Sequence, residues 1–151
     1  YNDIDLLGGI RPVLGVRHGL ANNFSNQSHL DTDPAHLRFT RYYYDYWEER
    51  LSPSVQFTLI ESGFITRLGY EFAIRRYAGR LAQKTDGTYG KDKLAQYSGS
   101  FTAEAVYPLF RHIDVKLQGN WATSSSNNHY EQVYRYNYYS SMYFAGLEWR
   151  F

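Results

Sequence analysis

The sequence predicts an all-β chain folded as one antiparallel up-and-down β-barrel, and three observations predict it. Apolar and polar residues alternate through long stretches such as Phe64 to Ile74, and a period of two belongs to strands rather than helices. Aromatic residues make up 19% of the 151 residues, although the mean hydropathy is only -0.57. Short expected connections, at 61–63 and 108–111, alternate with long ones, at 78–92 and 124–131. These features predict a single domain over residues 1–151.

Eight strands are expected, because single-chain bacterial barrels have an even strand number and eight suits this length. We expect them at about 4–14, 16–30, 36–47, 53–61, 64–77, 93–107, 111–123 and 132–151. Residues 1–35 are the least regular, and they must supply the first two strands. The stretch LRFTRYYYDYW predicts the third strand, although its two faces are too similar to orient it. Alternation of Val55, Phe57 and Leu59 with polar residues predicts the fourth, which ends at the turn Glu61-Ser62-Gly63.

The later strands are predicted more clearly. The fifth has an apolar face from Phe64 to Ile74 and ends before a polar stretch with Asp86-Gly87 as a turn signal. The sixth alternates up to Tyr107, and Pro108 is expected to end it. The seventh begins near Ile113, and the loop TSSSNNH follows it. The eighth alternates strictly over its last ten residues, MYFAGLEWRF.

The second face of these strands is polar and predicts the lining of a barrel. Its candidate residues are Arg67, Glu71, Arg75, Gln96, Glu104, Asp114, Lys116, Glu148 and Arg150. A packed core would not hold so many polar groups, because each one left without a partner costs about 1–3 kcal/mol. In an eight-stranded barrel the interior is only wide enough for side chains, so these groups would form a closed network. In a larger barrel, of which this chain is the C-terminal part, they would line an aqueous pore.

A soluble antiparallel barrel or sandwich is the alternative fold class. It also alternates, but its inner face is built from branched aliphatic residues and its outer face is polar. This chain has few Ile and Val, and its apolar faces carry small residues such as Gly99, Ala103 and Gly119 beside many tyrosines. Tyrosine and tryptophan collect where an apolar medium meets water, which favours a membrane protein.

Composition excludes several classes of function. No stretch approaches 18 consecutive apolar residues, as a transmembrane helix requires. The net charge is +1 and no Lys/Arg stripe is present, so no nucleic-acid partner is expected. The chain has no Cys, and its histidines show no metal-site spacing; they are His18, His29, His36, His112 and His129. We expect no metal and no cofactor.

Catalysis is not expected either. A nucleophile and a base could be assembled from Ser25 or Ser28 with His18 or His29, as in a lipid-modifying outer-membrane enzyme. Five histidines among many serines make such proximity common by coincidence. The sequence therefore favours a non-enzymatic protein.

The last strand resembles the C-terminal insertion signal of Gram-negative outer-membrane β-barrels. That signal has a terminal Phe preceded by hydrophobic or aromatic residues at alternate positions, here Tyr143, Leu147, Trp149 and Phe151. The resemblance implies a multi-pass β-barrel in the outer membrane, inserted by the barrel assembly machinery and in contact with lipid and lipopolysaccharide. The stretch SNNHYEQVYRYNYY is similar, more weakly, to the tails of porin-like families that serve exopolysaccharide or surface-protein export.

Two non-enzymatic functions follow from this resemblance, and a lipid-modifying outer-membrane enzyme is the third. The first expectation is a small surface barrel with a structural or binding role through its extracellular loops, and protein partner subunits are possible. In and next to loop 78–92, Lys84, Lys91 and Lys93 are candidates for lipopolysaccharide phosphates. The alternative is a channel or export barrel that moves polysaccharide, protein or solute.

Overall fold

The structure, a computed structural model, describes residues 9–31, 38–130 and 136–149. The described chain is all-β. Its strands are β1 (Ile10–Asn23), β2 (His29–Asp31), β3 (Arg38–Thr40), β4 (Tyr46–Leu59), β5 (Ile65–Gln83), β6 (Tyr89–Phe110), β7 (Ile113–Ser126) and β8 (Tyr138–Trp149). Within these ranges we find no helix that is long and apolar enough to cross a bilayer.

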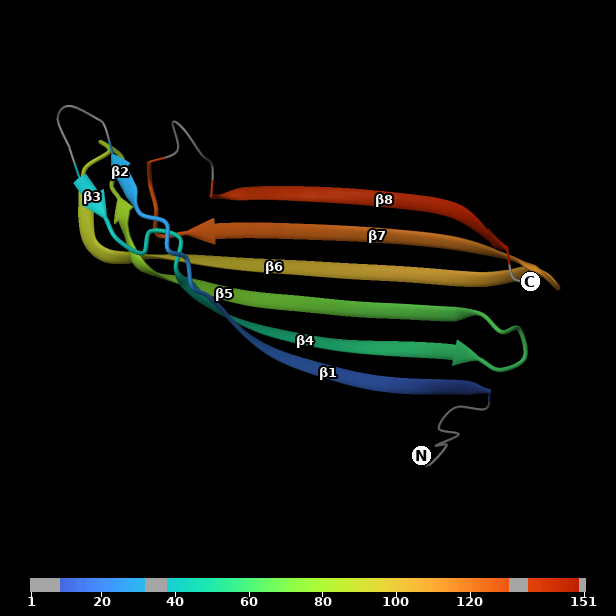
Figure 1. The fold of residues 1–151 in the computed structure, drawn as a ribbon. Coiled ribbons are helices and arrows are strands. Elements are labelled where there is room, and N and C mark those ends of the chain that lie inside the picture. Colours follow the sequence, from blue (N-terminus) through green and yellow to red (C-terminus); the bar gives the residue numbers. More distant parts are fainter. Residues whose placement is uncertain (1–8, 32–37, 131–135, 150–151) are drawn as a thin grey trace.

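Six long strands form one antiparallel up-and-down sheet in the order β1-β4-β5-β6-β7-β8. Each long strand pairs with the next long strand along the chain, and β2 and β3 pair separately within the connection from β1 to β4. The six strands lie side by side, with β1 and β8 at opposite edges (Figure 1). The prediction of an all-β up-and-down fold is confirmed, but the sheet is open rather than closed into a barrel.

The first four predicted strands have different bounds because their sequence patterns were ambiguous. Strand β1 runs unbroken through residues 10–23, where a break between 4–14 and 16–30 was expected; residues 1–8 lie outside the description. The expected strand at 36–47 is also wrong, since only Arg38–Thr40 is a strand there. The chain then reverses at Tyr42, whose φ is 56°, and β4 starts at Tyr46 rather than at 53. Charged residues on both faces of this segment had hidden its alternation.

The expected loop 78–92 is mostly strand. Strand β5 continues to Gln83, and β6 already begins at Tyr89. A tight turn with Gly87 at φ 85° joins them. This turn confirms the Asp86-Gly87 signal. Pro108 lies inside β6 instead of ending it, next to a register shift between Pro108 and Phe110. A proline is tolerated there because the ladder is already interrupted. The turn at Glu61-Ser62-Gly63 is confirmed, with Gly63 at φ 68°.

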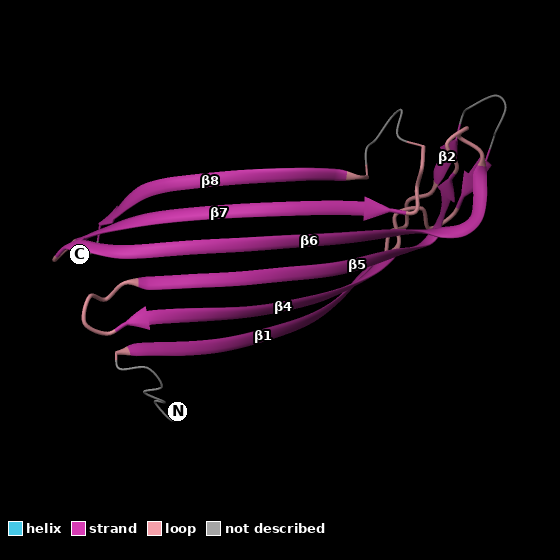
Figure 2. Ribbon diagram, turned by 180° about the vertical axis from the view of Figure 1, so that it is seen from behind, coloured by secondary structure: helices cyan, strands magenta, loops and turns pink. Residues whose placement is uncertain are grey.

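The sheet has two ends with different connections. At the turn end, a few residues join β4 to β5 and β6 to β7. At the loop end lie the connection from β1 to β4, the projecting tips of β5 and β6, and the connection from β7 to β8 (Figure 2). Of the two connections predicted to be long, the one from β7 to β8 is longer than the turns at the other end, whereas β5 and β6 are joined by a tight turn.

The register separates an apolar face from a polar face, although on β8 the polar face also carries Met142 and Phe144. The apolar face includes Leu14, Val16, Leu51, Val55, Phe57, Leu68, Phe72, Phe101, Val115, Leu117, Tyr143, Leu147 and Trp149. Its charged and histidine side chains, His18, Glu49 and Arg76, all lie toward the loop end. Among the described residues only Ala73, Ala82, Leu94 and Tyr136 are buried hydrophobic residues, so the described part of the chain does not cover the apolar face.

Candidate binding groove on the polar face

The middle of the polar face carries a charged ladder across three strands. Arg67 of β5 lies opposite Glu104 of β6, and its guanidinium pairs with that carboxylate. Lys116 of β7 approaches the same carboxylate from the other side, with 2.8 Å between its Nζ and Oε2. The Arg67 Nε also donates to the side-chain carbonyl of Gln56 at 2.8 Å. The side chain of Glu104 is 13% exposed, so a mostly buried carboxylate is held by two cations.

The structure distributes the other predicted lining residues along the same face. Arg75 pairs with Glu48, and Gln96 lies beside Arg75 in register. Glu71 accepts a hydrogen bond from the hydroxyl of Ser52 at 3.3 Å. At the turn end, buried Asp114 lies in register with Glu148. Arg150 lies outside the described residues.

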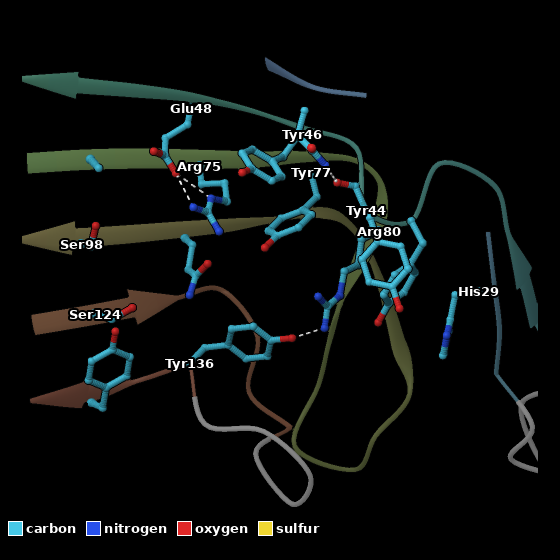
Figure 3. Close-up of a pocket in the computed structure, with 15 residues that line it drawn as sticks. His29, Tyr44, Tyr46, Glu48, Arg75, Tyr77, Arg80, Ser98, Ser124 and Tyr136 are labelled. Atoms are coloured by element: carbon cyan, nitrogen blue, oxygen red, sulfur yellow. Dashed lines mark hydrogen bonds and ion pairs between the residues drawn. The ribbon is translucent and has the colours of Figure 1, made fainter. Parts of the chain in front are cut away.

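A groove of about 700 Å³ lies at the loop end of this face and is here called the loop-end groove. Its lining is rich in tyrosine and consists of Asn23, His29, Tyr43, Tyr44, Tyr46, Glu48, Ala73, Arg75, Tyr77, Arg80, Gln96, Ser98, Ser124, Tyr136 and Tyr138. Figure 3 shows the tyrosines and both arginines gathered from the sheet and from the connections at this end. The groove therefore joins the strand surface to the loops.

A buried carboxylate fixes one wall of the loop-end groove. Glu48 is 4% exposed, and it accepts hydrogen bonds from the Nε of Arg75 at 2.6 Å and from the Nε of Arg50 at 2.5 Å. The guanidinium of Arg75 also lies over the ring of Tyr46, 4.3 Å from its centre. A cation above an aromatic face is attracted by the ring quadrupole. Arg75 is thus held in one orientation along the groove.

Arg80 connects three segments at the opposite wall. Its guanidinium lies 4.6 Å from the ring centre of Tyr43, 5.4 Å from that of Tyr77 and 5.2 Å from that of Tyr136. It also donates a hydrogen bond to the Tyr136 hydroxyl. Burial raises the pKa of Tyr136 above its ordinary value, although the nearby guanidinium of Arg80 opposes this rise. Arg80 thereby ties both long connections to β5.

The connection from β1 to β4 is placed beside the groove by backbone contacts. The Asn23 amide donates to the carbonyl of Tyr44 at 2.7 Å, and the backbone N–H of Ala78 donates to the carbonyl of Asp45 at 2.9 Å. Gly79 makes this approach possible, because a Cβ there would lie 2.3 Å from the carbonyl oxygen of Arg41. These contacts bring Tyr43 and Tyr44 onto the polar face.

Of the histidines and loop lysines expected from the sequence, only His29 lines the loop-end groove in the described chain. His18 pairs with Glu49 on the apolar face, with 3.0 Å between Nε2 and Oε1, and His29 stacks on Tyr43. No group of three His, Asp or Glu side chains suited to a metal ion occurs in the described parts of the chain. Lys84 and Lys91 line a separate hollow of about 520 Å³ at the tip of β5 and β6. Lys93 is exposed and does not line it.

Sequence reasoning missed the centre of the loop-end groove. Glu48 and Arg80 were not candidates, because one lay in a strand that could not be oriented and the other in an expected loop. The excess of tyrosine was assigned to the lipid interface, yet a large share of it lines the groove. The alternation of Tyr46, Glu48 and Arg50 was the signal that could have placed these residues on one face.

The residues expected to form the insertion signal lie on the apolar face of β8. Tyr143 accepts a hydrogen bond from the indole N–H of Trp121 at 3.0 Å, and Leu147 and Trp149 follow it at alternate positions. Phe151 lies outside the description. In comparisons with known proteins, no family model, no curated protein and no solved structure matches the chain.

Proposed function

We propose that this chain forms part of the wall of an outer-membrane β-barrel channel, with its apolar face toward lipid and its polar face toward an aqueous lumen. The observation that carries the proposal is the contrast between the two faces of the sheet. One face is apolar and uncovered, and the other holds charged side chains in hydrogen-bonded pairs. The proposed role is passage or binding of a solute without catalysis.

The apolar face supports contact with lipid. Between the turn end and the row of His18, Glu49 and Arg76, it carries no Asp, Glu, Lys, Arg or His among the described residues. Leu14 and Leu147, near opposite edges, are 81% and 72% exposed. Soluble monomers rarely expose contiguous apolar patches beyond a few hundred Å². A lipid bilayer would cover this surface without a second protein layer.

The strand lengths also support a membrane span. Crossing the hydrocarbon layer takes about 9–11 residues of a tilted strand. Strands β1, β4 and β7 have 14 residues each, and β8 has 12. Most residues of these strands are paired with a neighbouring strand, so the two outer edges of the sheet are the main backbone groups that still need partners in lipid.

The open edges favour a barrel wider than the described sheet. An unpaired edge is not tolerated in the bilayer, and single-chain bacterial barrels begin at eight strands. Six strands lie in this sheet, and β1 and β8 run antiparallel to each other at its edges. Further strands, from a longer chain or from partner subunits, would close the wall. A wide barrel would give the ladder of Arg67, Glu104 and Lys116 an aqueous lumen to face.

Four measurements on the same preparation test this proposal. We expect the protein in the outer-membrane fraction, with a mobility on gels that changes on boiling, and with a mass or an assembly large enough for more than eight strands. In planar bilayers we expect stepwise conductance. Recovery only in the soluble fraction, with no affinity for lipid, would overturn the proposal. A closed barrel of the chain alone without conductance would replace the channel by the small surface barrel.

A further inference from the structure

We propose that the loop-end groove binds an acidic saccharide chain. This inference rests on the proposed channel and names the class of solute that the channel binds. It comes from three features of the groove that are independent of the apolar face, namely its size, the chemistry of its rings and its charge.

The size and lining of the groove suit a polar ligand of several rings. Its volume of about 700 Å³ falls within the range of about 300–1,000 Å³ typical of ligand pockets. Ala73 is its only aliphatic lining residue in the described chain, so it offers little surface for an acyl chain. Hydrogen-bonding side chains line the groove together with the rings, including Asn23, Gln96, Ser98 and Ser124.

Tyrosine matches the two kinds of surface that a sugar presents. A pyranose ring has an apolar C–H face and an edge of hydroxyl groups, and tyrosine has an apolar ring and a polar tip. Tyr46 and Tyr77 are neighbours across β4 and β5, with ring centres 5.7 Å apart, and Tyr138 lines the groove from β8, at the edge of the sheet. Rings on both walls let one sugar unit stack while its hydroxyls reach the polar side chains.

The charge of the groove favours an acidic sugar over a neutral one. Glu48 is already shared by Arg50 and Arg75, which leaves this trio with one excess positive charge. No carboxylate of the described residues pairs with Arg80, whose guanidinium contacts tyrosine rings and one phenol. A guanidinium binds carboxylates through a planar fork of donors. Carboxylates spaced along a saccharide would meet Arg75 and Arg80 in succession.

The rest of the polar face argues against a nucleic acid. A phosphate backbone needs a continuous path of cations. Beyond the groove, Glu71 and Glu104 lie among Arg67 and Lys116, so the path alternates in sign. A polymer of widely spaced charges and many hydroxyl groups is compatible with this surface.

Binding is tested on the full chain purified from membranes in mild detergent. The probes are a short oligogalacturonate, a malto-oligosaccharide of equal length as the neutral control, and an oligoglutamate of equal charge. We expect titration calorimetry to detect the galacturonate and to give at least tenfold weaker binding of the neutral sugar and the peptide. Arg80→Gln should weaken galacturonate binding about tenfold or more. Lys91→Gln removes the same charge outside the loop-end groove and should leave binding unchanged.

A second variant separates binding from loop placement, because Arg80 also holds the connections together. Ser98→Trp fills the groove without removing any contact of Arg80 and should abolish binding. No saccharide binding by a barrel that is inserted and heat-modifiable would overturn this inference and leave the channel standing. Equal affinity for the neutral sugar, or preference for the peptide, would also overturn it. A soluble protein that bound galacturonate through Arg80 would support the site and overturn the channel.

Discussion

Glu48 and Glu104 each hold two basic side chains on the polar face, and these carboxylates organise its charge. Both are largely shielded from water, at 5% and 13% side-chain exposure. Removing a shared carboxylate leaves two cations near each other without a counter-charge, which costs more than losing one surface ion pair. The sequence placed Glu104 on this face because its strand alternates clearly. It could not place Glu48, whose strand has charges on both faces.

Glu104→Gln should lower the free energy of unfolding by about 1–3 kcal/mol, because Arg67 and Lys116 lose their common partner. Urea unfolding in lipid vesicles, followed by tryptophan fluorescence, measures this change. Glu71→Gln is the matched control on the neighbouring strand, since Glu71 is exposed and has only a 3.3 Å hydrogen bond from Ser52. A loss as large for Glu71→Gln as for Glu104→Gln would contradict the role of the ladder.

At the scale of elements, strand β5 positions the loop-end groove. It extends beyond the sheet to Gln83, and Gly79 in this extension receives the backbone of the connection from β1 to β4. The carbonyl oxygens of Arg41 and Tyr42 occupy the space that a side chain would need. Only glycine permits this approach, so one residue couples the strand to the loop.

Gly79→Val should detach the connection from β5 and expose it. Limited proteolysis with trypsin should cut at Arg41 several times faster than in the unmodified protein, because this backbone loses its contact. Gly69→Val is the control on the same strand, where a new Cβ meets nothing within 4 Å. Unchanged cleavage of the Gly79→Val protein would show that the loop does not depend on this contact.

Alternation predicted β5, β6 and β7 well, because each has one apolar and one polar face over most of its length. Alternation failed to predict the strand bounds where a strand extends beyond its neighbours in the sheet or where both of its faces carry charged residues. The extensions of β5 and β6 looked like a loop because the turn between them contains the polar residues Lys84, Thr85 and Asp86. The groove could not be predicted, since it depends on contacts between segments far apart in the sequence, as between Arg80 and Tyr136.

At the scale of the whole molecule, the sheet buries almost no apolar residues of its own. In the proposed membrane setting, the medium on its apolar face and the ladder of backbone hydrogen bonds stabilise it. If that medium is lipid, a charged substitution should destabilise the protein at one residue of a strand and have little effect at its neighbour. Strand β7 offers the cleanest comparison because Leu117 and Gln118 are adjacent and point to opposite faces.

Leu117→Arg should destabilise the protein in vesicles by about 2–4 kcal/mol if its position lies near the bilayer midplane. Gln118→Arg should change stability by less than about 0.5 kcal/mol, because its side chain would face water. Equilibrium unfolding of both variants in vesicles makes the comparison. Equal effects would argue against lipid on one face and water on the other.

The most direct test of a lipid-facing wall is a spin-label scan of β7. The chain has no cysteine, so each single-cysteine variant from Asp114 to Ser124 carries one label. In vesicles, labels at odd positions such as Val115, Leu117 and Trp121 should collide with dissolved oxygen. Labels at even positions such as Lys116, Gln118 and Asn120 should collide with a water-soluble nickel complex. This period of two with opposite phases is the predicted result. Odd positions that are inaccessible to both reagents would mean that protein, not lipid, covers the apolar face.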